Sequence, residues 1–200
     1  MAAILDIETP HGPARAHVTK VRGAAGAVVL GHGAGGGVGA PDLVTVAEVA
    51  QAEKLSVALV EQPYRVAGRR SPAPAAQLDA AWIAVVAHLR ATAFKRVPIV
   101  CGGRSSGARV ACRTSAETGS VGVLCLAFPL HPPGRPEKSR LDELDAVSGP
   151  VLVVQGASDP FGMPPPGPSR TVVTIAGNHS LRSDREALRT AVRDWLSQVL

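Results

Sequence analysis

Aromatic residues are scarce in this chain of 200 residues, which has three Phe, two Trp and one Tyr. Proteins that bind single-stranded nucleic acid stack its bases on aromatic side chains beside a basic stripe. The formal net charge is +5, but no basic block is longer than a pair such as Arg69-Arg70. We therefore expect no nucleic-acid partner.

Cysteine is also rare, and long apolar runs are lacking. Three cysteines are too few for a disulfide framework, and no CxxC or Cys/His cluster indicates a metal site. No apolar run approaches the ~20 residues of a membrane helix. The first residues include Asp6 and Glu8 and lack the pattern of a secretion signal. These absences predict a cytoplasmic protein with no metal, no organic cofactor and no membrane partner.

Apolar residues make up 46% of the chain, enough to bury a core. Eight short runs have strand character, and most are apolar on both faces, as in a parallel sheet covered on both sides. These runs are residues 4–8, 15–21, 27–31, 55–60, 97–102, 121–127, 151–155 and 171–176.

Helical patterns alternate with these strands, at residues 41–53, at 75–89, after Ser105 and at 183–198. In the last of these, Ser183-x-x-Glu186 predicts a capping box. The alternation predicts one α/β domain over residues 1–200, with a mostly parallel sheet of about six to eight strands and helices on both faces. Segments 61–74, 129–139 and 161–169 follow strands, contain Gly and Pro, and are candidate walls of a ligand site.

Two glycine motifs compete for the functional interpretation. Residues Gly31–Gly36 match GxGxxG after a strand, and the next strand ends at Glu61, as in a dinucleotide-binding fold. The expected helix, however, begins only at Pro41, several residues too late for a pyrophosphate site. The second motif, Gly103-Arg104-Ser105-Ser106-Gly107, is GxSxG in the strand–turn–helix context of a nucleophile elbow.

A serine nucleophile needs a base, and the base must be oriented. Asp159 follows one later strand and His179 follows the next. The order Ser, Asp, His is that of α/β-hydrolases, and parallel strands bring all three residues to one sheet edge. We therefore predict Ser105, Asp159 and His179 as a catalytic triad.

The first glycine motif then has a second interpretation, as the loop that supplies an oxyanion hole. We predict the backbone N–H groups of Ala34 and Ser106 as its donors, and a bracing role for His32. Gly33 and Gly35, in the same loop, are candidate substrate-binding residues.

Three other residues are candidates for binding substrate: Arg65, Arg70 and His131. Guanidinium groups bind carboxylates through paired hydrogen bonds, which would favour a substrate with a free acid group. The alternative is that arginines of this loop are solvated, pair with Glu61 or brace the Pro-rich loop.

Several segments resemble small α/β-hydrolases of the dienelactone-hydrolase-like group, and most closely the hydrolase-like family of testis-expressed protein thirty and the third NSL-complex subunit. The matching segments are LGHGAGG, EQPYRVAGRR, GGRSSGARVA, FPLHPPGRPEK, VQGASDPFG and GNHSL, over roughly residues 28–181. The resemblance implies a compact hydrolase fold with Ser105, Asp159 and His179 as its triad. It departs from dienelactone hydrolase proper, whose nucleophile is a cysteine; here Cys101 lies inside the preceding strand.

The function expected from the sequence is cleavage of an ester or similar acyl bond of a small soluble substrate. The interval from Pro129 to Leu141 is too short for a helical lid, which predicts an open site. Two alternatives remain: a binding or scaffold protein with a vestigial triad, and a dinucleotide-binding oxidoreductase that uses Gly31–Gly36. The oligomeric state, the acyl group and the leaving group are left open.

Overall fold

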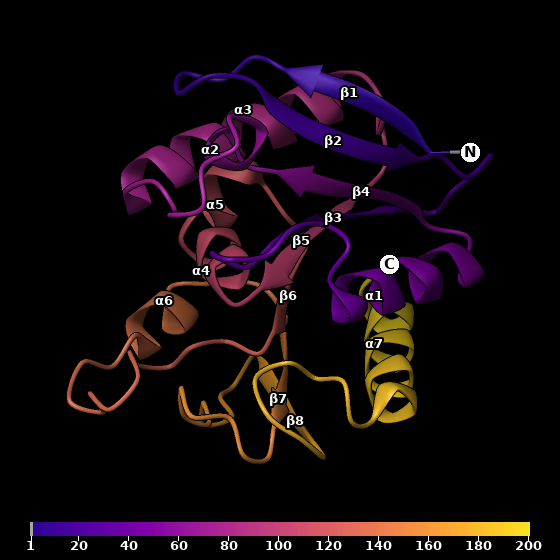
Figure 1. Cartoon of the computed structure of the whole chain (residues 1–200). Helices are drawn as coiled ribbons and strands as arrows, with labels where there is room; N and C mark the ends of the chain where they lie inside the picture. The colour runs from indigo at the N-terminus through magenta and orange to yellow at the C-terminus, as the bar shows by residue number, and fades with distance from the viewer. Residues whose placement is uncertain (1) are drawn as a thin grey trace.

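The computed structural model, in which residues 2–200 are described, contains one eight-stranded sheet of order β1-β2-β4-β3-β5-β6-β7-β8 (Figure 1). β1 pairs antiparallel with β2 and β2 with β4, whereas all other neighbours are parallel. The predicted mostly parallel α/β architecture is thus confirmed. The strands are β1 (Ala3–Ile7), β2 (Ala14–Thr19), β3 (Ala27–Gly31), β4 (Ser56–Glu61), β5 (Ile99–Arg104), β6 (Gly122–Leu126), β7 (Val151–Gly156) and β8 (Arg170–Ile175).

Helices cover both faces of the sheet, as predicted. On one face, α1 (Pro41–Ala52) packs beside α7 (Arg185–Val199), and their buried side chains share one apolar cluster (Figure 1). On the other face lie α3 (Ala75–Ala91), α4 (Ser106–Arg113) and α6 (Leu141–Asp145), which contribute to a second cluster. The inner strands separate the two clusters and are buried along their whole length, which explains their uninterrupted apolar runs.

Three short helices were not predicted: α2 (Pro63–Val66), α5 (Ser115–Thr118) and α6. α2 lies in segment 61–74, one of the candidate walls of the ligand site, and begins at Pro63, whose fixed φ suits a first helical position. The predicted capping box at Ser183 is wrong. Asp184 is the N-cap of α7, and its carboxylate accepts the N–H of Ala187, so the cap lies one residue later.

No helix or strand lies within residues 127–140, between β6 and α6, so nothing there forms a lid. This confirms the expectation of a lidless fold. Among residues 2–200, none of the helices is both long enough and apolar enough to span a bilayer.

Candidate functional site

Ser105 lies at the sharp turn between β5 and α4, with a strained backbone of φ 52° and ψ −109°. The turn is tightly packed against the end of β3. A Cβ added to Gly103 would lie 2.5 Å from the carbonyl oxygen of Gly31, and one added to Gly107 would lie 2.4 Å from the same atom. Both flanking positions therefore require glycine, which is the physical basis of the GxSxG spacing.

The structure brings the three predicted catalytic residues into one chain of hydrogen bonds. The Nε2 atom of His179 lies 3.0 Å from Oγ of Ser105, and Nδ1 lies 2.8 Å from Oδ2 of Asp159. The Asp159 side chain is 1% exposed and that of His179 is 18% exposed. The carboxylate accepts a hydrogen bond from the Nδ1–H group, which leaves the Nε2 lone pair facing the serine hydroxyl. The arrangement can therefore take a proton from Ser105.

Asp159 has two further donors, which the sequence did not reveal. The buried side-chain amide of Gln155 donates from Nε2 to Oδ2 at 3.0 Å, and also to the carbonyl oxygens of Phe128 and Gly162. The backbone N–H of Phe161 donates to Oδ1 at 2.9 Å. A glutamine at the end of an otherwise apolar strand was the available signal for this contact.

An aromatic ring packs against the imidazole. The ring centroids of Phe161 and His179 are 4.3 Å apart, with an interplanar angle of 39°. His131 lies behind this loop: its backbone N–H donates to the carbonyl oxygen of Phe161, and its Nδ1 bonds the carbonyl oxygen of Pro132. Gly162 packs closely against the His131 ring, since a Cβ added to Gly162 would lie 2.7 Å from Nε2 of His131. His131 thus holds the segment that follows Asp159.

The glycine loop after β3 lies against the nucleophile turn. A Cβ added to Gly33 would lie 3.6 Å from Cβ of Ser105 and 2.9 Å from Nη1 of Arg104. Within residues 2–200, no protein acceptor is found for the backbone N–H groups of Ala34 and Ser106. Neither predicted oxyanion donor is therefore paired within the described part of the protein.

His32 has the bracing contacts expected of it. Its Nδ1 bonds the carbonyl oxygen of Gly33 at 2.8 Å, and its Nε2 accepts the backbone N–H of Gln62 at 3.2 Å. Burial lowers the pKa of His32 below its ordinary value of 6.5, so the neutral ring is favoured. The hydroxyl of Tyr64 donates to the carbonyl oxygen of Ala34 at 2.9 Å, a contact that the sequence did not reveal.

The basic loop after Tyr64 makes its side-chain hydrogen bonds away from Ser105, His179 and Asp159. Arg65 donates to the carbonyl oxygen of Arg69 within its own loop, and Arg70 is exposed. Glu61 pairs with His17 at 2.7 Å rather than with these arginines. Among residues 2–200, neither Arg65 nor Arg70 has a hydrogen bond or ion pair with Ser105, Asp159 or His179.

Arg104 connects three parts of the site. Its Nε lies 2.8 Å from Oδ2 of Asp42 in α1, and its Nη2 donates to the carbonyl oxygen of His179 at 3.0 Å. Burial raises the pKa of the Asp42 carboxyl, although Arg104 acts in the opposite direction. A pocket of about 540 Å³ opens beside this pair, and it is lined by the segment from Gly35 to the start of α1 and by Arg104, Ser180 and Arg182.

The first turn of α1 is poorly suited to a pyrophosphate. Pro41 has no N–H, and the Asp42 carboxylate accepts the N–H of Leu43 at 2.9 Å. The positive end of the helix dipole is therefore already matched by a buried negative charge. Glu61, which suggested a ribose-binding acid, pairs with His17 instead. The glycine motif that suggested a pyrophosphate site packs against the nucleophile turn.

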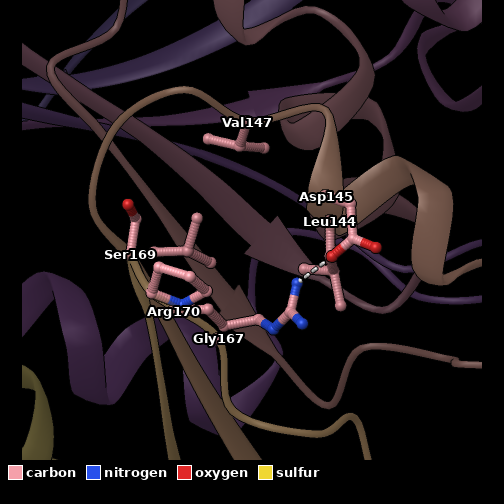
Figure 2. A pocket seen from close by; sticks show the side chains of 8 residues that line it. Leu144, Asp145, Val147, Gly167, Ser169 and Arg170 are labelled. Carbon is pink, nitrogen blue, oxygen red and sulfur yellow. Dashed lines mark hydrogen bonds and ion pairs between the residues drawn. The ribbon is translucent and has the colours of Figure 1, made fainter.

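Two further features lie outside the Ser105–His179–Asp159 site. Burial raises the pKa of Cys101 to about 12, so this thiol is a poor nucleophile at neutral pH. A second pocket lies at the amino-terminal end of β8, where the Arg170 guanidinium points to Asp145 and pairs with it at 2.8 Å (Figure 2). Arg170 also donates to the carbonyl oxygen of Pro165, so its contacts hold the preceding loop.

Comparisons with known proteins agree with this architecture. A family model described as "Alpha/beta hydrolase domain" matches residues 24–196. Est1E from Butyrivibrio proteoclasticus is 16% identical, with 98% of each chain covered and a TM-score of 0.78. XC6422 from Xanthomonas campestris, described as an α/β serine hydrolase without a lid, is 21% identical over 97% of this chain and 94% of that one, with a TM-score of 0.75. Dienelactone hydrolase from Anabaena variabilis is 19% identical over 100% and 96%, with a TM-score of 0.74.

Proposed function

The chain belongs to the alpha/beta hydrolase domain family, and we propose that it is a serine hydrolase that cleaves an ester or similar acyl bond of a small, water-soluble substrate. The observation that carries the proposal is the pair of hydrogen bonds from Ser105 Oγ to His179 Nε2, at 3.0 Å, and from His179 Nδ1 to Asp159 Oδ2, at 2.8 Å. Such a chain at a strained strand–turn–helix position is the geometry of an activated serine.

In the proposed reaction, Ser105 Oγ attacks the acyl carbon while His179 Nε2 takes the hydroxyl proton. The carbonyl oxygen becomes an oxyanion that accepts hydrogen bonds from the N–H groups of Ala34 and Ser106. Collapse of the tetrahedral intermediate expels the alkoxide, which receives the proton from His179 and leaves as the alcohol. Asp159 holds the imidazole in the required tautomer and stabilises its cationic form.

The acyl-enzyme is then hydrolysed. Water gives one proton to His179 Nε2 while its oxygen attacks the acyl carbon, and the same N–H groups hold the second oxyanion. The intermediate releases the carboxylic acid and Ser105 recovers its proton. None of these reaction steps requires a metal or an organic cofactor.

We propose a small, soluble substrate because no lid covers the site and the adjoining pocket is open to solvent. Ferulic acid is bound in one structure of Est1E, which makes feruloyl esters reasonable members of a test panel. A panel of p-nitrophenyl esters of increasing chain length, with Ser105→Ala as control, tests the proposal. Strong activity on emulsified long-chain triglycerides would contradict the proposed substrate class.

A charged substrate is a separate proposal. Arg65 and Arg70 are solvent-accessible and could grip a free carboxylate at a distance from the acyl group. Matched esters with and without a carboxylate test this role in Arg65→Ala and Arg70→Ala. A selective loss of kcat/KM on the acidic ester supports the carboxylate-binding role. Equal losses on both esters would show that the arginines stabilise the structure instead.

Three further assignments belong to the proposal. We propose one domain over residues 1–200, supported by a single sheet and a family match over residues 24–196. The more specific likeness to the family of testis-expressed protein thirty and the third NSL-complex subunit rests on PYRVAGRR, PLHPPGRPEK and QGASDPFG. A cytoplasmic location is proposed from the cysteine content of the sequence.

A further inference from the structure

The two carbonyl groups that flank the predicted oxyanion donor both accept hydrogen bonds, one from within the glycine loop and one from Tyr64. The carbonyl oxygen of Gly33 accepts the N–H of Gly36 at 3.1 Å and bonds Nδ1 of His32 at 2.8 Å. The carbonyl oxygen of Ala34 accepts the hydroxyl of Tyr64 at 2.9 Å. Two successive peptide planes of the glycine loop are therefore fixed from their carbonyl sides.

Fixing a carbonyl also fixes the next N–H group, because the two point in opposite directions across a planar trans peptide. No peptide bond in residues 2–200 is cis. The bonds to Gly33 thus set the direction of the Ala34 N–H, and the Tyr64 bond sets that of the Gly35 N–H. Gly33 packs against Ser105, since its added Cβ would lie 3.6 Å from Cβ of the serine. The glycine loop therefore packs against the nucleophile turn at Gly33, the residue before Ala34.

Tyr64 is itself held rigidly enough to serve as an anchor. It lies in α2, is 6% exposed, and packs edge-on against His32 with ring centroids 5.7 Å apart. Burial raises the pKa of its phenol, so the hydroxyl keeps the proton that it donates throughout the neutral range. His32 in turn accepts the N–H of Gln62, which joins the glycine loop to the segment that contains Tyr64.

We propose that Tyr64 is a positioning residue that holds Ala34, the residue whose N–H is the proposed oxyanion donor of the glycine loop, from its carbonyl side. The inference rests on the proposed hydrolase function, since an oxyanion must form for the alignment to matter. Preorganised donors act on the transition state more than on the bound substrate. Loss of the hydroxyl therefore lowers kcat and leaves KM nearly unchanged.

The test compares the wild-type protein with Tyr64→Phe, which removes one hydroxyl and keeps the ring. Thr118→Val is the matched control, because it removes a buried hydroxyl that donates to the Thr114 carbonyl at 2.9 Å in α5, near the opposite end of the sheet. Kinetics with p-nitrophenyl acetate, inhibition by phenylboronic acid and the melting temperature are measured for all three proteins. The pH profile of kcat/KM is measured as well.

For Tyr64→Phe we expect kcat to fall about tenfold, less than the 10²–10³-fold typical when a direct oxyanion donor is lost. KM should stay within about twofold, and the inhibition constant of phenylboronic acid should rise by about the same factor as kcat/KM falls. The acid limb of the pH profile should not move, because the Ser105–His179–Asp159 chain is untouched.

Equal kcat in Tyr64→Phe and Thr118→Val would overturn the positioning role while leaving the proposed hydrolase intact. A fall in kcat that accompanies a matching rise in KM, or a shifted acid limb, would assign Tyr64 to general packing instead. A wild-type protein that hydrolyses no ester would overturn the proposed function, and this inference with it.

Discussion

The side-chain amide of Gln155 donates a hydrogen bond of 3.0 Å to the Asp159 oxygen that also accepts from His179. A neutral donor at this position stabilises the carboxylate without adding charge. The amide oxygen of Gln155 is buried without a protein partner among the described residues, whereas its nitrogen has three acceptors. The amide is therefore oriented with its nitrogen toward Asp159 and the loop that follows it.

Replacing Gln155 by Glu should move the acid limb of the kcat/KM profile to higher pH. The substitution places a second carboxyl group beside Asp159, and added negative charge favours the protonated imidazole of His179. We expect kcat to fall at least about tenfold at neutral pH, since the lost hydrogen bond and the added repulsion both disturb the base. The measurement is the pH profile on one activated ester.

Gln51→Glu is the matched control, because it makes the same charge change on an exposed residue of α1. An acid limb that moves equally in both variants would attribute the shift to net charge. An unmoved acid limb in Gln155→Glu would show that Gln155 does not affect the protonation of His179.

The glycines of the nucleophile turn should be intolerant of a single added carbon. Gly103→Ala and Gly107→Ala would each force a Cβ to within 2.5 Å of the Gly31 carbonyl oxygen, which belongs to a buried strand and cannot move cheaply. We expect each substitution to lower the free energy of unfolding by about 3 kcal/mol. Urea denaturation measures this change.

Gly37→Ala provides the comparison, since nothing lies within 4 Å of its added Cβ. Its stability should stay within about 0.5 kcal/mol of the wild type. Equal effects at Gly37 and Gly103 would show that the close approach to β3 does not govern the cost.

Acidification should weaken the fold through His32. Its pKa is lowered by burial, so the unfolded chain takes up a proton at a higher pH than the folded one does. The stabilisation is then complete above the unfolded-state pKa of about 6.5 and is lost as the pH falls through the lower folded value. Unfolding free energies between pH 8 and pH 5 should fall more steeply for the wild type than for His32→Gln.

His88→Gln is the control for this measurement, since His88 lies on the exposed side of α3. The two slopes of wild type and His88→Gln should agree. A His32→Gln slope as steep as theirs would mean that His32 is not the titrating group.

Much of the fold and of the hydrogen-bonded chain was predictable because both depend on local patterns. Buried parallel strands need apolar runs, and the turns at their carboxyl ends place Ser105, Asp159 and His179 at one edge. The supporting contacts were not predictable. Gln155 bonds within a loop whose path was unknown, and Tyr64 meets Ala34 across 30 residues of sequence.

The helix cap at Asp184 shows a different limit. Ser183 and Asp184 are both good N-cap residues, and sequence spacing favoured the serine because Glu186 follows it by three residues. The structure instead uses the carboxylate, while Ser183 packs close to Gly177. Tertiary contacts of this kind decide between neighbouring residues of similar propensity.

The central claim is that Ser105 is an activated nucleophile, and labelling with a fluorophosphonate followed by peptide mapping tests it most directly. We predict one covalent adduct, on Ser105, that is absent in Ser105→Ala and retained in Ser197→Ala, which changes an exposed serine of α7. An adduct on Ser106, or a wild-type protein that no fluorophosphonate labels, would contradict the account.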